Sequence, residues 1–389
     1  MLVSLLARLL VPALLPAFAS SLSVLRFKSN LESLIDHFEL GLAMGTKFRK
    51  EIGQRVVQNE ALQTRLLPFY HSEAGRATYT KFLSKHQDVF PHYVEELRGI
   101  ANGSQIAFET IFINNLFEEF SAAMPDGKDR GGIDGCSDYV VCEKTSGPCL
   151  IGHNEDNDLR DVGHAFVLET RNFIAYTYMG DLPSGAFGFN SHGVGFTLNW
   201  LGPENTVTGG LGRGFMSRSL LDAASLNAAV AKVSREGQST GHNYQLFSQR
   251  DQRVLNVEVS PGGGGSAEQP IVSVRNLTNA TPFFHANQYQ TLSVPQIFSN
   301  SSIHRLARVR ELPIPHNRTA LLEVLGDQED RHYPVFHDNV SHEHGDLSDW
   351  TLATALFSLR NGGKMTIFEG NPKHGDVAYE TRIMPFPAL

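Results

Sequence analysis

The pattern of hydrophobic and polar positions changes near residue 135. Before it, apolar and small residues recur at helical spacing, as in HFELGLAMGTKFRKEIGQRV and HYVEELRGIANGSQIAFETIFINNLFEEF. The pattern predicts a mainly helical segment over residues 30–122. Asn and Gly favour turns, so the second stretch is expected to form two helical runs broken at Asn102-Gly103-Ser104.

After residue 135, short alternating or β-branched runs follow one another, separated by Gly, Pro and Asn. Examples are CSDYVVC, CLIGHN, HAFVLET, FIAYTYM and GVGFTLNW, which predict strands. Helical spacing returns over residues 219–236. Strands resume with HNYQLFSQ and RVLNVEVS, and the glycine-rich stretch 260–266 predicts a hairpin loop.

Near the end of the chain, the pattern predicts a helix over residues 302–312 and a closing hairpin from 351–358 and 364–369. Strands and helices thus occur in blocks and do not alternate strictly. This grouping favours a layered α+β fold over a doubly wound parallel sheet. No internal repeat is found, and no linker divides the chain into two self-sufficient halves, so one domain is expected.

Composition and charge exclude several classes of protein. The 389 residues are 41% hydrophobic and 19% charged, which is typical of a globular chain with a sizeable core. The net charge of -8 comes from 41 acidic and 33 basic residues dispersed along the sequence. Without a concentrated basic field, nucleic acid is not an expected partner.

The N-terminus has the pattern of a secretory signal peptide. A lone Arg8 precedes an apolar stretch, and Ala17-Phe18-Ala19 forms a small-x-small cleavage site. Residues 1–19 are therefore predicted to be removed, placing the protein outside the cell or in the secretory lumen, including a lysosome or vacuole. The apolar stretch is too short to span a bilayer, and no later one is long enough.

Asn-x-Ser/Thr sequons fit the same location, since a chain in the secretory pathway can carry glycans at such sites. Most of them fall between residues 276 and 339, which predicts that much of this stretch is surface. The six candidate glycosylation sites are Asn102, Asn276, Asn279, Asn300, Asn317 and Asn339.

Three cysteines, Cys136, Cys142 and Cys149, lie within fourteen residues. An odd number in a secreted chain leaves one thiol without an intrachain partner, which is then intermolecular or reactive. Cys142 and Cys149 flank the turn-rich sequence EKTSGP between two apolar runs. A disulfide across a hairpin is therefore plausible, with Cys136 as the free thiol.

The peptide around Gly135-Cys136 is suited to cleavage from within. Glycine leaves the carbonyl before the thiol open to attack and tolerates strained backbone geometry. If the thiol attacks that carbonyl and the thioester hydrolyses, Cys136 becomes a chain terminus with both a nucleophile and a free amine. An α-amino group with a pKa of about 7.7 to 8.0 can act as a base near neutral pH. The alternative is a small buried hydrophobe, as most free cysteines are.

The cluster Gly152-His153-Asn154-Glu155-Asp156-Asn157-Asp158 comes next along the predicted hairpin. It can return beside the strand that begins at Cys136, where one carboxylate could hold and orient the new ammonium group. The alternatives are a solvated acidic turn, because Asn and Asp crowd turns, and a calcium loop, although the glycine and distal glutamate of an EF-hand loop are missing.

These motifs resemble the isopenicillin N acyltransferase family of cysteine N-terminal-nucleophile enzymes, which includes the insect Tan protein, a β-alanyl-dopamine hydrolase. The matching stretches are HFELGLAMG, EELRGIANG, FINNLFEE, DGCSDYVV, GHNEDND, GVGFTLNW, HANQY and TLATALFSL. The resemblance implies a four-layer αββα fold. It also implies a precursor that cleaves itself before Cys136, with an α-rich chain of residues 20–135 and a chain of residues 136–389 that stay associated.

The resemblance further implies roles for individual residues. Cys136 is expected to be the nucleophile, Asp156 the carboxylate near the new terminus, and Asn287 the oxyanion-hole donor. Asn199 is expected beside the pocket, and Arg305 is a candidate for substrate contact. As alternatives, Asn287 could be a turn residue, Asn199 a strand cap and Arg305 a solvated charge.

Other motifs favour neither a metal nor a cofactor. The glycine-rich stretch 209–214 lacks the Gly-Lys-Ser/Thr ending of a phosphate loop, and HEHGD does not match the zinc motif HExxH. A Ser-His-Asp site has no GxSxG sequence to support it. No metal and no cofactor are therefore expected.

The sequence leaves three functions open. One is an amidohydrolase that releases an amine from a small N-acyl or β-alanyl amide. Another is an acyltransferase that uses the same acyl-enzyme, and the last is a secreted binding protein without catalysis. Acyl-coenzyme A is not expected in the secretory lumen, so water is the default acceptor and hydrolysis is favoured.

Overall fold

The computed structural model describes residues 22–125, 135–142, 149–183, 185–261, 270–278 and 281–389. The predicted signal peptide, the glycine run of the predicted hairpin loop and the sequon at Asn279 lie outside these ranges. Within them, no helix is long and apolar enough to cross a membrane. The five sequons at Asn102, Asn276, Asn300, Asn317 and Asn339 are all exposed.

The lead segment is helical, as its hydrophobic spacing predicted. Its helices are α1 (Leu34–Lys47), α2 (Arg49–Gln58), a π-helical turn (Leu62–Leu66), α3 (Leu67–His71), α4 (Glu73–Val89), α5 (Pro91–Ser104), α6 (Phe108–Asn114) and α7 (Phe117–Ala122).

The break expected at Asn102-Gly103-Ser104 was wrong in position. These three residues form the last turn of α5, which ends where Gln105 takes a left-handed conformation with φ of 62°. The run that follows is divided again, between α6 and α7.

Helices α1 and α5 approach each other closely at glycines. A Cβ added to Gly41 would lie 1.9 Å from the carbonyl oxygen of Glu96, and one on Gly99 would lie 2.1 Å from that of Phe38. Side chains at these positions would push the two backbones apart. The glycines of HFELGLAMG and EELRGIANG therefore serve helix packing.

Two sheets form the centre of the molecule. The eight-stranded sheet has the order β1-β4-β5-β6-β7-β8-β9-β10 and the six-stranded sheet the order β11-β2-β3-β12-β13-β14. The first contains β1 (Ser23–Phe27), β4 (Ala165–Thr170), β5 (Phe173–Tyr178), β6 (Phe187–Asn190), β7 (Val194–Leu201), β8 (Gly241–Ser248), β9 (Arg253–Ser260) and β10 (Ile271–Asn276). The second contains β2 (Ser137–Cys142), β3 (Cys149–Asn157), β11 (Phe283–His285), β12 (Trp350–Ser358), β13 (Lys364–Phe368) and β14 (Val377–Arg382).

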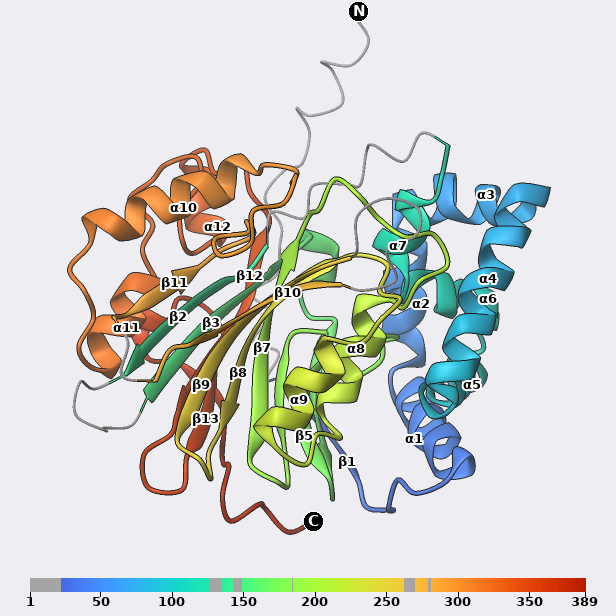
Figure 1. Ribbon diagram of the computed structural model, residues 1–389, viewed down its shortest axis with the longest axis horizontal. Helices are drawn as coiled ribbons and strands as arrows, with labels where there is room; N and C mark the ends of the chain where they lie inside the picture. The colour runs from blue at the N-terminus through green and yellow to red at the C-terminus, as the bar shows by residue number, and fades with distance from the viewer. Residues whose placement is uncertain (1–21, 126–134, 143–148, 184, 262–269, 279–280) are drawn as a thin grey trace, which may run out of the picture.

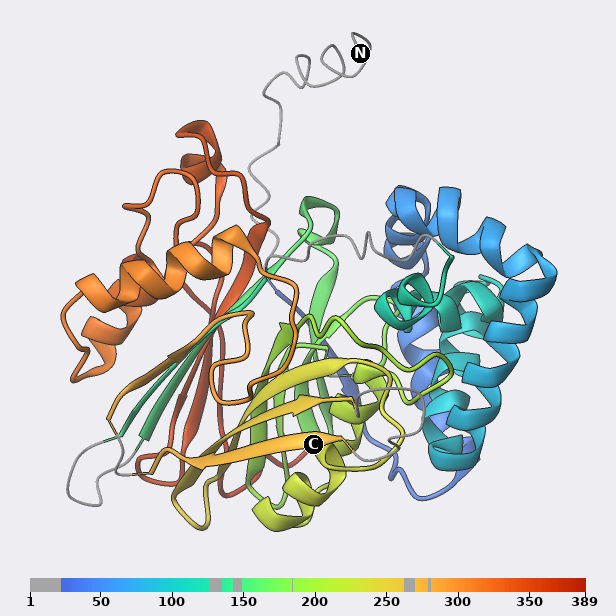
Figure 2. The same ribbon diagram turned by 45° about the horizontal axis from the view of Figure 1, so that its top comes forward.

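Helices cover the outer face of each sheet, giving four layers (Figures 1 and 2). The lead helices with α8 (Arg213–Leu220) and α9 (Leu226–Val233) lie on the larger sheet. On the smaller sheet lie α10 (Asn300–Glu311) and α11 (Arg318–Leu325), with the short α12 (Asn339–Glu343) nearby. The buried apolar residues form three clusters, one for each interface between layers. The four-layer α+β prediction is thus confirmed.

Three details differ from the predicted elements. The helix expected over 219–236 is two helices, α8 and α9, and α8 begins earlier, at Arg213. The hairpin of β12 and β13 is not the last element, because β14 adds to the same sheet. Strand β1 was not predicted, and it pairs in parallel with β4.

Candidate active site

Cys136 lies at the start of β2, where the backbone leaves extended geometry. Its φ of 44° places a non-glycine residue in the left-handed region, a conformation that costs about 1–3 kcal/mol and is common at functional sites. The antiparallel register pairs Ser137 with Asn154, so Cys136 comes to lie next to Glu155 of β3. The predicted return of the acidic cluster beside Cys136 is confirmed.

The disulfide prediction is confirmed as well. Cys142 and Cys149 are bonded and face each other across β2 and β3. Cys136 is a free cysteine and is buried. The cross-link fixes the register of the hairpin that presents the thiol.

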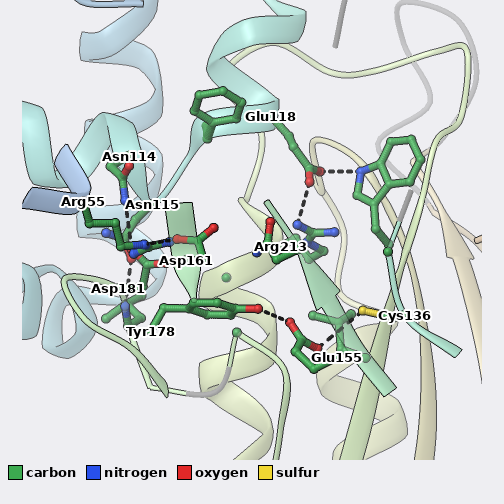
Figure 3. A pocket seen from close by; sticks show the side chains of 18 of the residues that line it. Arg55, Asn114, Asn115, Glu118, Cys136, Glu155, Asp161, Tyr178, Asp181 and Arg213 are labelled. Carbon is green, nitrogen blue, oxygen red and sulfur yellow. Dashed lines mark hydrogen bonds and ion pairs between the residues drawn. The ribbon is translucent and has the colours of Figure 1, made fainter. Parts of the chain in front are cut away.

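A chain of hydrogen bonds leads from the thiol into the space between the sheets. The Cys136 thiol donates to Glu155 Oε2 at 3.4 Å, and Tyr178 of β5 donates from its hydroxyl to Glu155 Oε1 (Figure 3). His153 bridges two carboxylates, with Nε2 2.9 Å from Glu155 Oε2 and Nδ1 2.8 Å from Asp138 Oδ1. All of these side chains are buried.

Burial and the bridging geometry set the charges of this chain. Burial by itself would lower the pKa of His153, but the Asp138 and Glu155 carboxylates raise the pKa of its imidazole to about 10. His153 is therefore a cation at neutral pH. Burial, together with the Glu155, Asp156 and Asp138 carboxylates, raises the pKa of the Cys136 thiol well above its usual range. The resting sulfur is a thiol, and it needs a base to become a nucleophile.

On the other side of the same peptide lies a buried cation. Arg305 of α10 is fully buried and donates from Nη2 to the carbonyl oxygen of Gly135 at 3.0 Å. Its Nη1 donates to the carbonyl oxygen of Cys136 at 2.7 Å and to Ser137 Oγ at 2.8 Å. The guanidinium thus holds both carbonyls around the Gly135-Cys136 bond. It is not among the residues that line the cavity described below.

The two predicted asparagines are held in hydrogen bonds to other residues of the chain. Asn287 accepts from Arg305 Nη2 at 2.8 Å through Oδ1 and donates to the Trp200 carbonyl at 3.1 Å through Nδ2. Asn199 accepts from Asn243 at 2.6 Å, while its Nδ2 has no hydrogen-bond partner among the described residues. Neither side chain lines the cavity. Asn287 is joined to the Gly135-Cys136 peptide through Arg305.

Asp156, in contrast, lines the cavity together with Gly135 and Cys136. Its Oδ1 accepts from the Thr351 hydroxyl at 2.6 Å. Its Oδ2 is buried without a hydrogen-bond partner in the described part of the chain, with His337 Nε2 4.0 Å away. An orphaned carboxylate oxygen beside Cys136 is an open acceptor site.

The cavity has a volume of about 150 Å³ and lies between the lead helices and the sheets. A cavity of this size holds a group about as large as one benzene ring. Carboxylates outnumber arginines in its lining, so the cavity has an anionic excess. The charged lining residues are Glu118, Glu119, Glu155, Asp156, Asp161 and Asp181 with Arg55, Arg160 and Arg213.

Two arginines, each with a pair of carboxylates, line the same cavity as the thiol (Figure 3). Arg55 of α2 pairs with Asp161 at 2.5 Å and with Asp181 at 2.8 Å. Arg213 pairs through Nη2 with Glu118 at 2.6 Å, and its backbone N–H donates to Glu119 at 2.7 Å. Burial and the neighbouring Glu118 raise the pKa of Glu119 to about 7.

Cys136, His153 and Glu155 bring potential ligand atoms within 4.8 Å of one another. Both ring nitrogens of His153 are engaged by carboxylates, and the ring is cationic. A metal ligand must be a neutral imidazole with a free lone pair. This donor set therefore suits proton transfer better than metal binding.

Sequence reasoning missed most of the thiol's neighbours. Asp138 and His153 lie one strand period from Cys136 and Glu155, so alternation along the predicted hairpin could have placed all four on one face. Tyr178, Arg55 and the other residues of the arginine clusters carried no comparable signal. They come from distant segments that only the packed layers bring together.

Comparisons with known proteins fit this geometry. The family described as acyl-coenzyme A:6-aminopenicillanic acid acyl-transferase matches residues 142–374, well over half of the chain. The β-alanyl-dopamine/carcinine hydrolase of Drosophila melanogaster is 25% identical over 359 residues, covering 86% of this chain and 91% of that protein.

Solved structures give more distant likenesses. The Caenorhabditis elegans ortholog of N-acylethanolamine-hydrolyzing acid amidase has a TM-score of 0.38 at 14% identity and covers 56% of this chain and all of that one. Penicillin V acylase from Agrobacterium tumefaciens has a TM-score of 0.37 at 11% identity and covers 60% of this chain and 83% of that one. On the extent of the family match, and in agreement with its motifs, this chain belongs to the acyl-coenzyme A:6-aminopenicillanic acid acyl-transferase family.

Proposed function

We propose that the chain is a self-processing cysteine amidohydrolase. Cys136 cleaves the Gly135-Cys136 bond, becomes an N-terminal nucleophile, and hydrolyses a small amide through a thioester acyl-enzyme. The observation that carries the proposal is the environment of that bond. A buried thiol bonded to Glu155 lies on one side, and a guanidinium on the Gly135 carbonyl lies on the other.

Asp156 is suited to the cleaved state. Cleavage turns the amide nitrogen of Cys136 into an amine, which needs an anionic partner in this buried place. The unpartnered Oδ2 of Asp156, on the cavity wall with Cys136, supplies one. This supports the role that the family resemblance implied for Asp156.

The two chains made by the cut would remain bound to each other. Strand β1, from the predicted light chain, is part of the larger sheet through its pairing with β4. Glu96 of α5 is fully buried and pairs with Arg218 of α8 at 2.7 Å, and Arg55 and Glu118 add ion pairs across the same boundary. Separating the chains would expose this charge and the main apolar cluster, which residues from both segments build.

The anionic excess of the cavity favours a substrate with a positive charge. A β-alanyl amide carries an ammonium group at neutral pH, and the Drosophila melanogaster relative is named for substrates of that kind. We therefore place β-alanyl amides ahead of uncharged N-acyl amides. The signal-like N-terminus and five exposed sequons support a glycosylated protein of the secretory pathway, where water is the available acyl acceptor.

The self-processing claim has a direct test. The purified protein is run on a denaturing gel, and the amino terminus of its larger fragment is sequenced. We expect a start at Cys136, and a single uncut band for Cys136→Ala. An active preparation made only of the uncut chain would contradict the mechanism.

The proposed substrate class is tested separately, with a panel of candidate substrates. Release of amine is measured from β-alanyl amines, N-acyl amino acids and penicillins, with and without an added amine acceptor. Hydrolysis predicts free acid in both conditions. An acyl product that forms only with the acceptor would favour acyl transfer instead.

A further inference from the structure

We propose that two different bases serve the two reactions of Cys136. Glu155 is the general base of self-cleavage, whereas turnover uses the α-amine base already expected for an N-terminal-nucleophile enzyme. His153, Asp138 and Tyr178 are positioning residues for Glu155. This inference rests on the self-processing proposed above and adds a catalytic residue to it.

The need for a separate base follows from the covalent state of the uncut chain. Before cleavage the nitrogen of Cys136 is part of a peptide bond, and its lone pair is delocalised into the carbonyl. The base that will later activate the thiol therefore does not yet exist. Burial and the surrounding carboxylates also raise the pKa of the Cys136 thiol, so self-cleavage has to use another acceptor for that proton.

Glu155 has the geometry of that acceptor. Its Oε2 lies 3.4 Å from the Cys136 sulfur, within hydrogen-bond range for sulfur. Its Oε1 is occupied by the Tyr178 hydroxyl, so the carboxylate cannot rotate freely and presents Oε2 to the thiol. A candidate base must first be within hydrogen-bond reach of the proton that it removes.

His153 pairs with Glu155 and orients it. The imidazolium bridges Glu155 Oε2 at 2.9 Å and Asp138 Oδ1 at 2.8 Å, so one buried cation lies between two buried anions. A buried carboxylate without such a partner would take up a proton and lose its basicity. The order of groups is carboxylate, imidazolium, carboxylate, thiol, in which the last carboxylate takes the part that histidine plays in a Ser-His-Asp triad.

The proton and bond changes balance without any co-reactant other than water. Glu155 takes the thiol proton while the sulfur attacks the Gly135 carbonyl carbon, and Arg305 Nη2 stabilises the oxygen that becomes negative. The C–N bond then breaks, and the proton passes from Glu155 to the departing nitrogen. Water next adds to the thioester, which yields the Gly135 carboxylate, regenerates the Cys136 thiol and releases one proton to solvent.

The neighbouring Asp156 is not suited to the same role. Its Oδ1 is held by Thr351, and its Oδ2 has a histidine nitrogen 4.0 Å away. No hydrogen bond between the Cys136 thiol and the Asp156 carboxylate occurs among the described contacts, whereas the thiol does bond Glu155. Substitution of Asp156, the adjacent carboxylate, therefore serves as the comparison for substitution of Glu155.

The test measures self-cleavage and turnover separately in Glu155→Gln, Glu155→Asp and Asp156→Asn. The full chain is purified soon after synthesis, and the uncut fraction is followed on denaturing gels. Turnover is then expressed per cut chain. We expect Glu155→Gln to slow self-cleavage by about 10²- to 10⁴-fold, the usual contribution of a general base. Glu155→Asp should restore part of that rate, and turnover per cut chain should fall far less.

Asp156→Asn should show the opposite balance, with turnover reduced more than self-cleavage. Thermal unfolding of each variant in a Cys136→Ala background checks that the fold is retained. Equal loss of self-cleavage and of turnover per cut chain in Glu155→Gln would overturn the assignment of two bases. So would self-cleavage of Glu155→Gln at the parent rate.

The pH dependence of the self-cleavage rate is a further measurement, and replacing Glu155 would not change it if the role of Glu155 were purely structural. With Glu155 replaced, only hydroxide can remove the thiol proton, so the self-cleavage rate should rise about tenfold per pH unit, while the parent rate levels off. Among the described residues, the titratable groups around Glu155 are His153 on its own strand, Cys136 and Asp138 at β2, and Tyr176 and Tyr178 of β5, with Asp156 adjacent. An unchanged profile in Glu155→Gln would contradict the proposal.

Hydroxylamine separates the two halves of the step, because it cleaves a thioester but not a peptide. If hydroxylamine restored cutting of Glu155→Gln, the block would lie at thioester hydrolysis and the inference would be wrong. If the parent chain itself stayed uncut, self-processing would fail as a whole. These two failures can therefore be told apart.

Discussion

The two sides of the Gly135-Cys136 peptide carry opposite charge. On the thiol side, between the sheets, Glu155 and Asp138 share one imidazolium, and the cluster as a whole is anionic. On the carbonyl side, toward α10, Arg305 donates to both flanking carbonyl oxygens. In the proposed self-cleavage, this difference separates two tasks: one side removes a proton, and the other receives the negative charge of the tetrahedral intermediate.

The thiol side can be tested by removing the imidazolium that bridges its two carboxylates. In His153→Phe, Glu155 and Asp138 would be buried without their shared partner, so the free energy of unfolding should fall by about 3–5 kcal/mol. Urea unfolding in a Cys136→Ala background measures this without interference from chain cleavage. A change below 1 kcal/mol would show that the bridge contributes little.

The same bridge predicts a pH dependence. The folded pKa of His153 is raised to about 10, whereas an unfolded histidine has a pKa of about 6.5. Its stabilisation is therefore fully present below pH 6.5 and is lost as pH rises toward 10. The fall in stability across this window should be absent in His153→Phe.

The carbonyl side can be tested by replacing Arg305, which donates to the Gly135 carbonyl oxygen. Replacing it with methionine removes the donor on the Gly135 oxygen, and self-cleavage should slow by about 10²- to 10³-fold, as for loss of one oxyanion donor. Arg308→Met is the matched control, because Arg308 lies on the same helix but pairs with Asp327 near the surface. Parent-like cleavage in Arg305→Met would separate the guanidinium from the chemistry.

A packing change away from both sides should alter stability alone. Gly41→Ala would place a Cβ 1.9 Å from the Glu96 carbonyl oxygen and should cost about 1–3 kcal/mol through overpacking. Gly53→Ala, with open space around the new methyl, should stabilise α2 by about 0.5–1 kcal/mol. Thermal unfolding compares the two, and self-cleavage per folded chain should match the parent in both.

A second pH effect is expected at Glu119, on the cavity wall. Glu119 has its pKa raised to about 7, so the folded chain keeps a proton there that an unfolded glutamate with a pKa near 4.5 releases. Stability should therefore fall as pH rises from 4.5 to 7. Glu119→Gln should flatten this part of the profile, which urea midpoints at several pH values would show.

Local patterns predicted much of this fold. Helical spacing located the lead helices, alternation located β2, β3, β7 and β12, and blocks of each type indicated α+β layering. The errors came where local signals compete with packing. Asn102-Gly103-Ser104 has the composition of a break but completes α5, because its glycine lets α1 approach closely. Strand β1 is too short to be recognised without β4 beside it.

For the site, the sequence alone identified Cys136 as the odd thiol, Cys142 and Cys149 as its cross-linked neighbours, and the acidic cluster as its counterpart. Those inferences depend on spacing within one hairpin, which the chain carries locally. Only the tertiary structure decided that Glu155, and not Asp156, meets the thiol, because the register of β2 and β3 decides which carboxylate faces it. It also decided that Arg305, 169 residues away, holds the carbonyls around the bond, since such a contact arises only when separate layers pack together.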